Sequence, residues 1–420
     1  MAKRGSKTLS GIALNTYGTL MYFFCQWLLT VVVARINGYA EAGVFSLAIS
    51  FANIFNYVEL WGIRNFQISD VQGLYSNGDY SGTRIVSTAI ALVLVPITLL
   101  LYGYERDVVL CCVAAVLFKT EESVTDLFFG TMQRQNRYDW IAVSYTLKGV
   151  IPAGMLLAAI MCGMTLYKAI FSMTAGYFLV LVFYDVLHLR GSGIFNPRMK
   201  SARKLLRLCF PLMLNGLISA YMIYIPRNAV QQILGSEELG FYASVSTVVV
   251  VLSTLSGSVW AALMPEISIQ VTKNNWTELK KMFWEIMAIL TIVSCFTLLL
   301  GNLLGPTLFS IVYGKEILSH MFLLTPVLLN AIMLMVDAFF DCYFIPMQKR
   351  AALLVCNGAG LILCFAMVSW ATESFGTVGA CCSMTAGLLL RFIMLIVLNQ
   401  SYLKKGLNHK ESTEQGNNSL

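Results

Sequence analysis

Charged residues are scarce in this sequence, and so are the features on which soluble enzymes and metalloproteins usually depend. Asp, Glu, Lys and Arg make up 12% of the 420 residues, and the three histidines share no motif. The eleven cysteines lie in apolar stretches without a CxxC spacing, which favours packing over disulfides or metal ligands. No connection is long enough for an extracellular catalytic domain. We therefore expect no metal, no cofactor and no enzyme.

The sequence is instead rich in long apolar segments. Hydrophobic residues make up 57% of the chain, and the mean hydropathy is +0.71. A bilayer core about 30 Å thick needs about 20 apolar residues per helix. The segments of this length are approximately 9–34, 42–63, 85–104, 108–130, 140–163, 165–187, 209–233, 239–264, 283–304, 317–345, 351–373 and 376–400. Because backbone polar groups in lipid must be paired internally, and because the runs do not alternate, we predict an all-α integral membrane protein of about 12 transmembrane helices, not a barrel.

The basic residues are distributed unevenly between the two sides of the membrane. If the N-terminus is inside, 21 of the 29 Lys and Arg fall in inside connections and 4 in outside ones. The positive-inside rule then places both termini in the cytoplasm. The net charge of +7 follows from this topology and does not indicate nucleic-acid binding. The first apolar stretch is too long for a cleaved signal, so we expect it to stay as the first span.

An internal repeat divides the chain into two halves. Residues 38–43 and 235–240 both read GxxExG, 197 residues apart, and each opens a span at an equivalent position. An even number of spans per half gives parallel repeats around a central cavity, which suits alternating access. The predicted parts are a six-helix lobe at 1–187, a cytoplasmic linker with six Lys and Arg at 188–208, a six-helix lobe at 209–403, and a disordered cytoplasmic tail at 404–420.

Charges within spans cost about 2.5–3.5 kcal/mol on insertion scales, so they are candidates for function. Lys119, Glu122 and Asp126 share one helix face at i, i+3 and i+7. They form either a self-neutralising Lys–Glu pair or a polar stripe along the cavity. Lys148 and Arg227 have no opposite charge within one helical turn. Each either binds an anionic substrate or completes a pair between two helices.

Three more charges lie in the last spans. Arg391 either lines the cavity as a substrate contact or extends to the cytoplasmic surface. Asp337 and Asp341 are spaced i, i+4 on one face of the tenth span. They either bind a coupling proton or sodium ion, or stabilise a helix interface.

Several motifs connect the chain to a known family. They are the run 43–48 (GVFSLA), the turn 77–80 (NGDY), the stretch 211–242, and 264–266 (MPE), which ends the eighth span. In their order and spacing they resemble the Wzx-type O-antigen flippases of the multidrug/oligosaccharidyl-lipid/polysaccharide (MOP) exporter superfamily. The resemblance implies a V-shaped bundle of two six-helix lobes. It also implies transport of a polyprenyl-diphosphate-linked oligosaccharide from the inner to the outer leaflet of a bacterial inner membrane, with a polysaccharide polymerase as a partner.

The resemblance also suggests roles for the cavity cations. Lys119, Lys148 and Arg227 would shield the diphosphate and the sugar. The sequence has fewer such cations than the family leads us to expect, so the acidity of the sugar stays open.

Other functions remain as alternatives. A cation or drug antiporter of the same superfamily would have an acidic cavity. A major-facilitator transporter would carry a GxxxD-R-x-G-R turn, which is absent from 64–84. A membrane polysaccharide polymerase or ligase would have a large outside loop with Arg and His, and the sequence has none. A scaffold would have little use for basic residues within spans.

Overall fold

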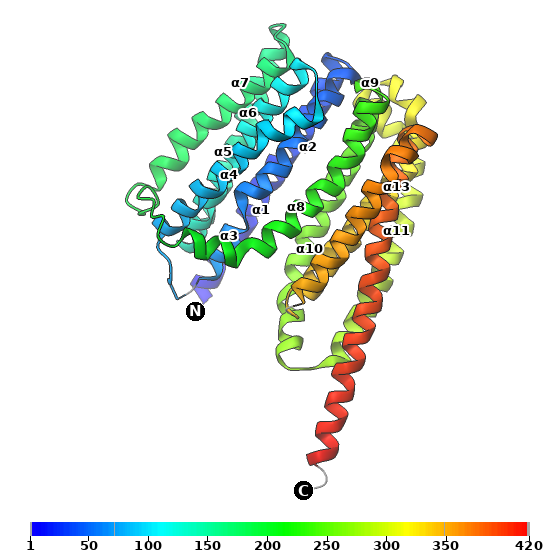
Figure 1. Ribbon diagram of the computed structural model, residues 1–420. Coiled ribbons are helices and arrows are strands. Elements are labelled where there is room, and N and C mark those ends of the chain that lie inside the picture. The colour runs from blue at the N-terminus through cyan, green and yellow to red at the C-terminus, as the bar shows by residue number, and fades with distance from the viewer. Residues whose placement is uncertain (1, 71, 348, 418–420) are drawn as a thin grey trace. The chain divides into compact units, whose positions relative to one another are not determined.

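The chain is helical throughout the part that the structure describes. A computed structural model describes residues 2–70, 72–347 and 349–417, and these ranges contain no strand (Figure 1). This confirms the predicted all-α fold. The helices of the first half are α1 (Ala2–Ile36), α2 (Tyr39–Leu60), α3 (Ile63–Ser69), α4 (Asn77–Tyr102), α5 (Arg106–Arg134), α6 (Tyr138–Met161) and α7 (Leu166–Val180), which continues as the π-helical turn η1 (Leu181–Val186).

The second half continues in the same way. Its helices are α8 (Ala202–Ile233), α9 (Ser236–Val245), α10 (Thr247–Thr272), α11 (Trp276–Tyr313), the 3-10 segment η2 (Lys315–Leu323), α12 (Leu324–Phe344) and α13 (Arg350–Asn417). Within the described residues, nine helices are long and apolar enough to cross a membrane. The fold is thus that of a multi-pass membrane protein.

The nine helices differ from the predicted twelve spans at three places. The expected span 239–264 is divided between α9 and α10 and is not among the nine. The expected span 108–130 lies in α5, whose many charges keep it out of the nine. The expected spans 351–373 and 376–400 both lie in α13, which is interrupted by a non-helical Gly376 (φ 61°, ψ −144°). The count of twelve therefore stays a prediction. α13 also continues to Asn417, through most of the stretch for which we predicted disorder; that stretch contains helix-forming Lys, Glu and Gln and no proline.

The chain forms two compact units. The first contains the residues up to Tyr224 together with 235–240, and the second contains 225–234 and the residues from Phe241 onward. α8 therefore begins in the first unit and ends in the second. The units divide within α8, after Tyr224, and not at the predicted linker 188–208. The division into two six-helix lobes at that linker stays a prediction.

In the first unit, α1 packs on α6, α2 on α5 and α4, and α7 on α5 and α6. α4 to α7 run side by side in Figure 1. In the second unit, α12 packs on α10, α11 and α13 around an aromatic core that includes Phe283, Phe339 and Tyr343. The outer side of α11 carries exposed apolar residues such as Ile292, Leu299 and Leu303, as expected of a helix in lipid.

The two GxxExG motifs contact each other within the first unit. A Cβ added to Gly43 would overlap the backbone carbonyl of Ser236 and lie 2.9 Å from the nitrogen of Gly240. A Cβ added to Gly240 would overlap the carbonyl of Tyr39. Tyr39 and Ser236 hold equivalent positions in the two repeats, 197 residues apart, and so do Gly43 and Gly240. The contacts Tyr39–Gly240 and Gly43–Ser236 are therefore equivalent by the repeat. The motif therefore allows two equivalent helix starts to cross closely, as small residues do in membranes.

Candidate functional site

The charged residues of α5 are paired within the first unit. Lys119 Nζ lies 2.7 Å from Glu122 Oε2, one helical turn away. The hydroxyl of Tyr22, on α1, donates a hydrogen bond to the other oxygen of Glu122. Both charged side chains keep some exposure, 14% for Lys119 and 18% for Glu122. Of the two interpretations that the sequence left open, the local Lys–Glu pair describes this geometry; whether the pair also lines a cavity stays a prediction.

Asp126 has different partners from its neighbours on the same face. Arg64, on α3, approaches Oδ1 at 3.2 Å, and Arg84, on α4, approaches Oδ2 at 3.0 Å. Arg84 also donates to the backbone carbonyl of Glu59 at 2.5 Å and is 2% exposed. One carboxylate thus joins α3, α4 and α5.

Sequence reasoning missed two of these residues. Arg64 and Arg84 each lie near the end of an apolar segment and belong to the 21 Lys and Arg that the predicted topology places in inside connections. The structure places both against Asp126, a pairing that the sequence did not predict, and their cytoplasmic side stays a prediction. The nearby carboxylate of Glu59 is also fully buried, and it accepts a hydrogen bond from Thr120 at 2.6 Å. The available signal was the long run of polar and charged residues in α5, which needed partners on other helices.

Lys148 forms a fully buried ion pair. Its ammonium contacts Asp185 of η1, both side chains are 0% exposed, and it donates to Thr125 at 2.6 Å. The ring of Tyr177 lies 4.7 Å from Nζ. The π-helical turn that contains Asp185 directs this carboxylate toward α6, and such turns are often found at functional sites. The geometry is that of the interhelical pair, and Lys148 is not exposed to a cavity in this structure.

The second unit holds a cluster of three charges. Arg391 of α13 contacts Asp337 and lies 3.0 Å from Asp341, both on α12. The arginine is buried, while the two carboxylates are 14% and 28% exposed. The i, i+4 spacing predicted that the two aspartates share a face, but it did not predict their common partner.

Arg227 lies elsewhere in the second unit. It follows Pro226 in α8, is partly buried, and interacts electrostatically with Tyr242 of α9. The predicted site residues therefore do not form one site. They fall into an α5-centred network, the Lys148–Asp185 pair, the Arg391 cluster and Arg227.

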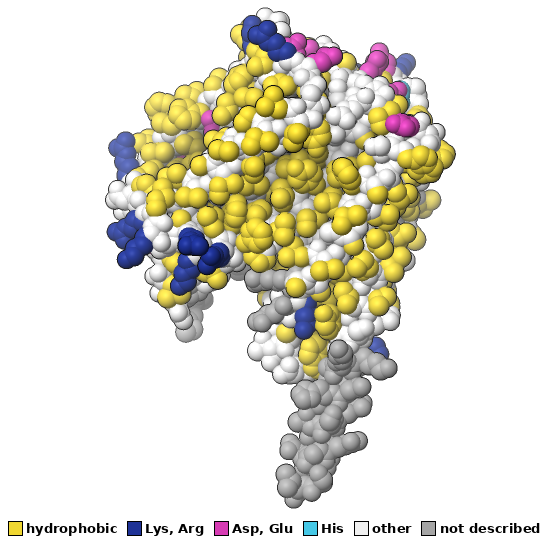
Figure 2. All heavy atoms as spheres, viewed as in Figure 1, with side chains coloured by type: hydrophobic (Ala, Val, Ile, Leu, Met, Phe, Trp, Pro, Cys, Tyr) yellow, Lys and Arg dark blue, Asp and Glu magenta, His cyan; other side chains and the backbone are white. Residues whose placement is uncertain are grey.

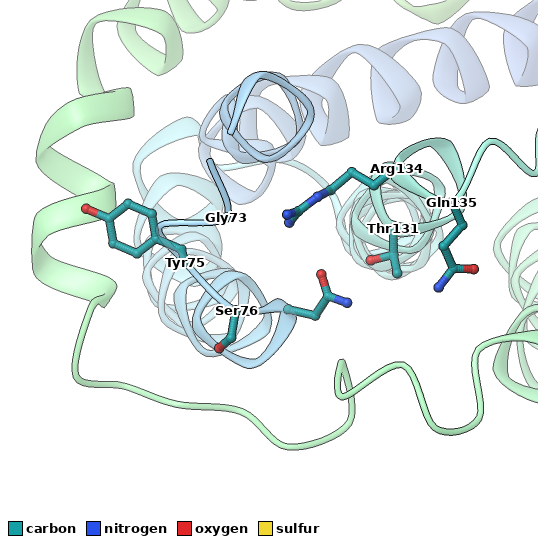
Figure 3. Close-up of a pocket in the computed structure, with 7 residues that line it drawn as sticks. Gly73, Tyr75, Ser76, Thr131, Arg134 and Gln135 are labelled. Carbon is teal, nitrogen blue, oxygen red and sulfur yellow. The ribbon is translucent and has the colours of Figure 1, made fainter. Parts of the chain in front are cut away.

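A polar pocket lies at one end of the first unit. Its volume is about 340 Å³, and Figure 3 shows the side chain of Arg134 pointing into it from the end of α5. The pocket is lined by Gly73, Tyr75, Ser76, Asn77, Thr131, Arg134 and Gln135. No predicted site residue lines it.

The neighbouring Asp70 holds one wall of this pocket in place. Its carboxylate accepts hydrogen bonds from the backbone of Leu74 at 2.9 Å and Tyr75 at 3.1 Å, and from the hydroxyl of Tyr80 at 2.8 Å. Burial acts to raise the pKa of Asp70, but these hydrogen bonds and the charge of Arg134 lower the pKa below its usual value. Asp70 therefore fixes the segment between α3 and α4.

Solved structures with a similar fold are transporters. The inward-facing structure of a multidrug resistance MATE family transporter of the MOP superfamily covers 93% of this chain and 96% of its own, at 12% identity and a TM-score of 0.66. The bent form of the Vibrio cholerae MATE transporter VcmN covers 96% and 98%, at 11% identity and a TM-score of 0.60. The protein thus has the fold of a MOP-superfamily membrane transporter.

Sequence comparison identifies the family. Residues 32–321 match the family described as polysaccharide biosynthesis protein. The capsular polysaccharide biosynthesis protein CapF of Staphylococcus aureus is 20% identical over 299 residues, which is 70% of this chain and 74% of CapF. The chain belongs to this polysaccharide biosynthesis family. The predicted resemblance is confirmed to this extent: the chain belongs to a polysaccharide biosynthesis family and has the fold of the MOP-superfamily transporters.

Proposed function

We propose that this protein moves a polyprenyl-diphosphate-linked oligosaccharide from the inner to the outer leaflet of a bacterial inner membrane. The match to a polysaccharide biosynthesis family on a transporter fold is the observation that carries this proposal. A lipid-linked repeat unit made in the cytoplasm must cross the bilayer before a polymerase can extend it outside. The proposal includes cytoplasmic termini and transport by alternating access, with the polymerase as a functional partner.

Arg227 and Lys119 are the substrate contacts that we propose first. The guanidinium of Arg227 offers a planar pair of donors suited to a phosphate, whereas the ammonium of Lys119 acts as a point charge. Pro226 cannot donate a backbone hydrogen bond, which leaves a carbonyl of the preceding turn available beside Arg227. Glu122 and Asp126 then set the position of the cations around them, and Lys148 supports α5 through its hydrogen bond to Thr125.

The Arg391 cluster is the place where we propose ion coupling. A proton or sodium ion that binds Asp337 or Asp341 competes with Arg391 for the same carboxylate. Binding of the ion would therefore release the guanidinium, which could then contact an anionic substrate. This exchange would link transport to an ion gradient.

Variants of Arg227 test the proposed function. Arg227→Ala should impair export in a flippase-deleted strain, and Arg227→Lys should retain part of it, because the charge remains while the fork is lost. Lys281→Ala, an exposed residue of α11, is the control and should export normally. Surface polysaccharide and protein level are measured together. Full export by Arg227→Ala would reject this residue as a contact, and loss of export with loss of protein would indicate a structural role.

A cation or drug antiporter is the alternative function. The fold similarity to multidrug transporters supports it, and so does Glu121, a partly buried carboxylate on α5 whose Oε2 accepts no hydrogen bond from the described residues. Proteoliposomes distinguish the two. Flipping of a lipid-linked oligosaccharide without efflux of ethidium supports the flippase, whereas dye efflux without flipping supports the antiporter.

A further inference from the structure

The connection between η1 and α8 carries an uninterrupted positive charge. No Asp or Glu occurs between Asp185 and Glu237, whereas six Lys and Arg fall within 190–207, and all six are exposed. We call residues 190–210 the basic segment. Its cations are Arg190, Arg198, Lys200, Arg203, Lys204 and Arg207. Figure 2 shows Lys and Arg side chains gathered at this end of the first unit.

The basic segment is held in a defined position. The backbone nitrogen of Arg198 donates to the carbonyl of Gly78 at 2.7 Å. The indole of Trp61 donates to the carbonyl of Leu206 at 2.8 Å, which fixes the first turns of α8 against the end of the first unit. The cations therefore occupy a fixed surface.

Exposed apolar side chains lie between these cations. Phe195 is 44% exposed, Met199 51% and Leu208 46%, and Leu74 on the neighbouring segment is 70% exposed. A surface that mixes Lys and Arg with exposed apolar groups is suited to the boundary of an anionic bilayer, where the cations meet phosphates and the apolar groups enter the acyl layer.

The polar pocket adjoins the basic segment. The side chain of Asn77, in the pocket wall, donates to the carbonyl of Ser192 at 2.8 Å. The ammonium of Lys204 lies 5.8 Å from the ring of Tyr75, which is also in the wall. Arg134 points into the pocket (Figure 3). The pocket is thus a recess beside a surface suited to lipid headgroups.

The pocket has groups for a phosphate and for hydroxyls. Arg134 supplies a guanidinium, and Asn77 and Gln135 supply amide groups. Two acids face this region. Asp70 interacts with the charge of Arg134. Asp79 accepts a hydrogen bond from Ser76 and interacts with the charge of Arg198. Together with the six cations of the basic segment, Arg134 leaves this end with an excess of positive charge.

We propose that this pocket and the basic segment form a binding site for the headgroup of an anionic phospholipid of the phosphatidylglycerol class. The phosphate contacts Arg134, and the glycerol hydroxyls contact Asn77 and Gln135. The cations of α8 attract the lipid, and Phe195 and Met199 lie against its acyl chains. The site differs from the proposed transport site and does not depend on it.

The test measures lipid binding to the purified full-length protein. The probe is phosphatidylglycerol added to protein in detergent, with phosphatidylcholine of the same acyl chains and inorganic phosphate as comparisons. The readouts are the lipid concentration that half-saturates the rise in apparent Tm, and lipid retained in native mass spectrometry. We expect phosphatidylglycerol to bind preferentially and the preference to fall at high salt. Equal effects of the two lipids, or equal effects of inorganic phosphate and phosphatidylglycerol, would overturn the proposal.

Two matched pairs of variants locate the site. Arg134→Gln should weaken phosphatidylglycerol binding roughly fivefold. Arg137→Gln, three residues on, should weaken it less, because Arg137 pairs with Asp139 outside the pocket. A triple variant of α8 should weaken binding more than a triple variant of the second unit that removes the same charge. The first is Arg203→Gln/Lys204→Gln/Arg207→Gln, and the second is Lys273→Gln/Lys280→Gln/Lys281→Gln. Equal losses within either pair would refute the assigned location. If a variant does not fold, the lipid preference and salt dependence of the unmodified protein still decide the proposal.

Discussion

Replacing Gly240 with Ala tests whether the crossing of the two GxxExG motifs stabilises the first unit. The added Cβ would overlap the carbonyl of Tyr39 and lie 3.0 Å from its Cα. Both of these are backbone atoms, so no side-chain rotation relieves the overlap and the helices must separate. Forcing extra volume into a packed contact typically costs about 1–3 kcal/mol.

The helical propensity of alanine acts in the opposite direction. Ala in a helix gains about 0.5–1 kcal/mol over Gly through backbone entropy. Gly154→Ala, in α6, is the matched control, because its added Cβ meets nothing within 4 Å. The propensity gain is common to both variants, so the difference between them reports the overlap alone. We expect Gly240→Ala to be less stable than Gly154→Ala by about 1–3 kcal/mol.

The assay is thermal unfolding in detergent, followed by the fraction of monodisperse protein that survives heating. A difference of this size should lower the apparent Tm of Gly240→Ala by a few degrees relative to the control. Gly43→Ala should behave like Gly240→Ala, since the two contacts are equivalent by the repeat. Equal stability of Gly240→Ala and Gly154→Ala would refute the close crossing, and a defect in only one of the two motif variants would refute its symmetry.

Three further predictions concern the charged groups. Lys148→Met should lose about 3–5 kcal/mol of stability, because it leaves Asp185 buried and uncompensated; Lys148→Met/Asp185→Asn should recover more than half of the loss in thermal unfolding. Arg391→Lys should lower the free energy of unfolding by about 1.5–3 kcal/mol, because an ammonium cannot engage Asp337 and Asp341 as the planar fork does. An unchanged Tm would contradict the contact of Arg391 with both carboxylates. Asp70→Asn should lower the Tm at pH 7 and have less effect near pH 3. The pKa of Asp70 is lower in the folded protein than in the unfolded chain, so the charged carboxylate stabilises the fold. This stabilisation is complete above the unfolded pKa of about 3.9 and is lost as the pH falls through the folded pKa. A pH-independent effect of Asp70→Asn would show that the carboxylate charge is not the cause.

The fold was predictable from the sequence because the solvent of this protein is lipid. Continuous apolar runs of about 20 residues leave the helix as the main solution, and their order follows directly from hydropathy. Hydropathy says less about the residues at the ends of these runs. Arg64 and Arg84 lie near such ends, and only the packing of α3 and α4 on α5 reveals that Asp126 draws both of them inward.

Partners on one helix were predictable, whereas partners on different helices were not. The spacing of Lys119 and Glu122 is enough to place them on one face, and they do pair. Lys148 and Asp185 are 37 residues apart, and Arg391 and Asp337 are 54 apart. Such pairs depend on which helices are neighbours and on local details such as the π-helical turn at η1. A single sequence contains the charges but gives no direct information on these neighbours.

These pairings have a consequence for the proposed transport. An anionic substrate that binds Lys119 or Arg391 must compete with a carboxylate that already neutralises the cation. The displaced carboxylate then keeps its negative charge without a cation beside it, which is costly in a region of low dielectric constant. A proton or sodium ion that neutralises the displaced carboxylate lowers this cost, so binding of substrate and binding of the ion favour each other by linkage. Under the proposed function, the pairing of Lys119, Lys148 and Arg391 with carboxylates is therefore a reason to expect ion coupling. An Asp337→Asn variant that still exports but no longer depends on the ion gradient would be the signature of this coupling.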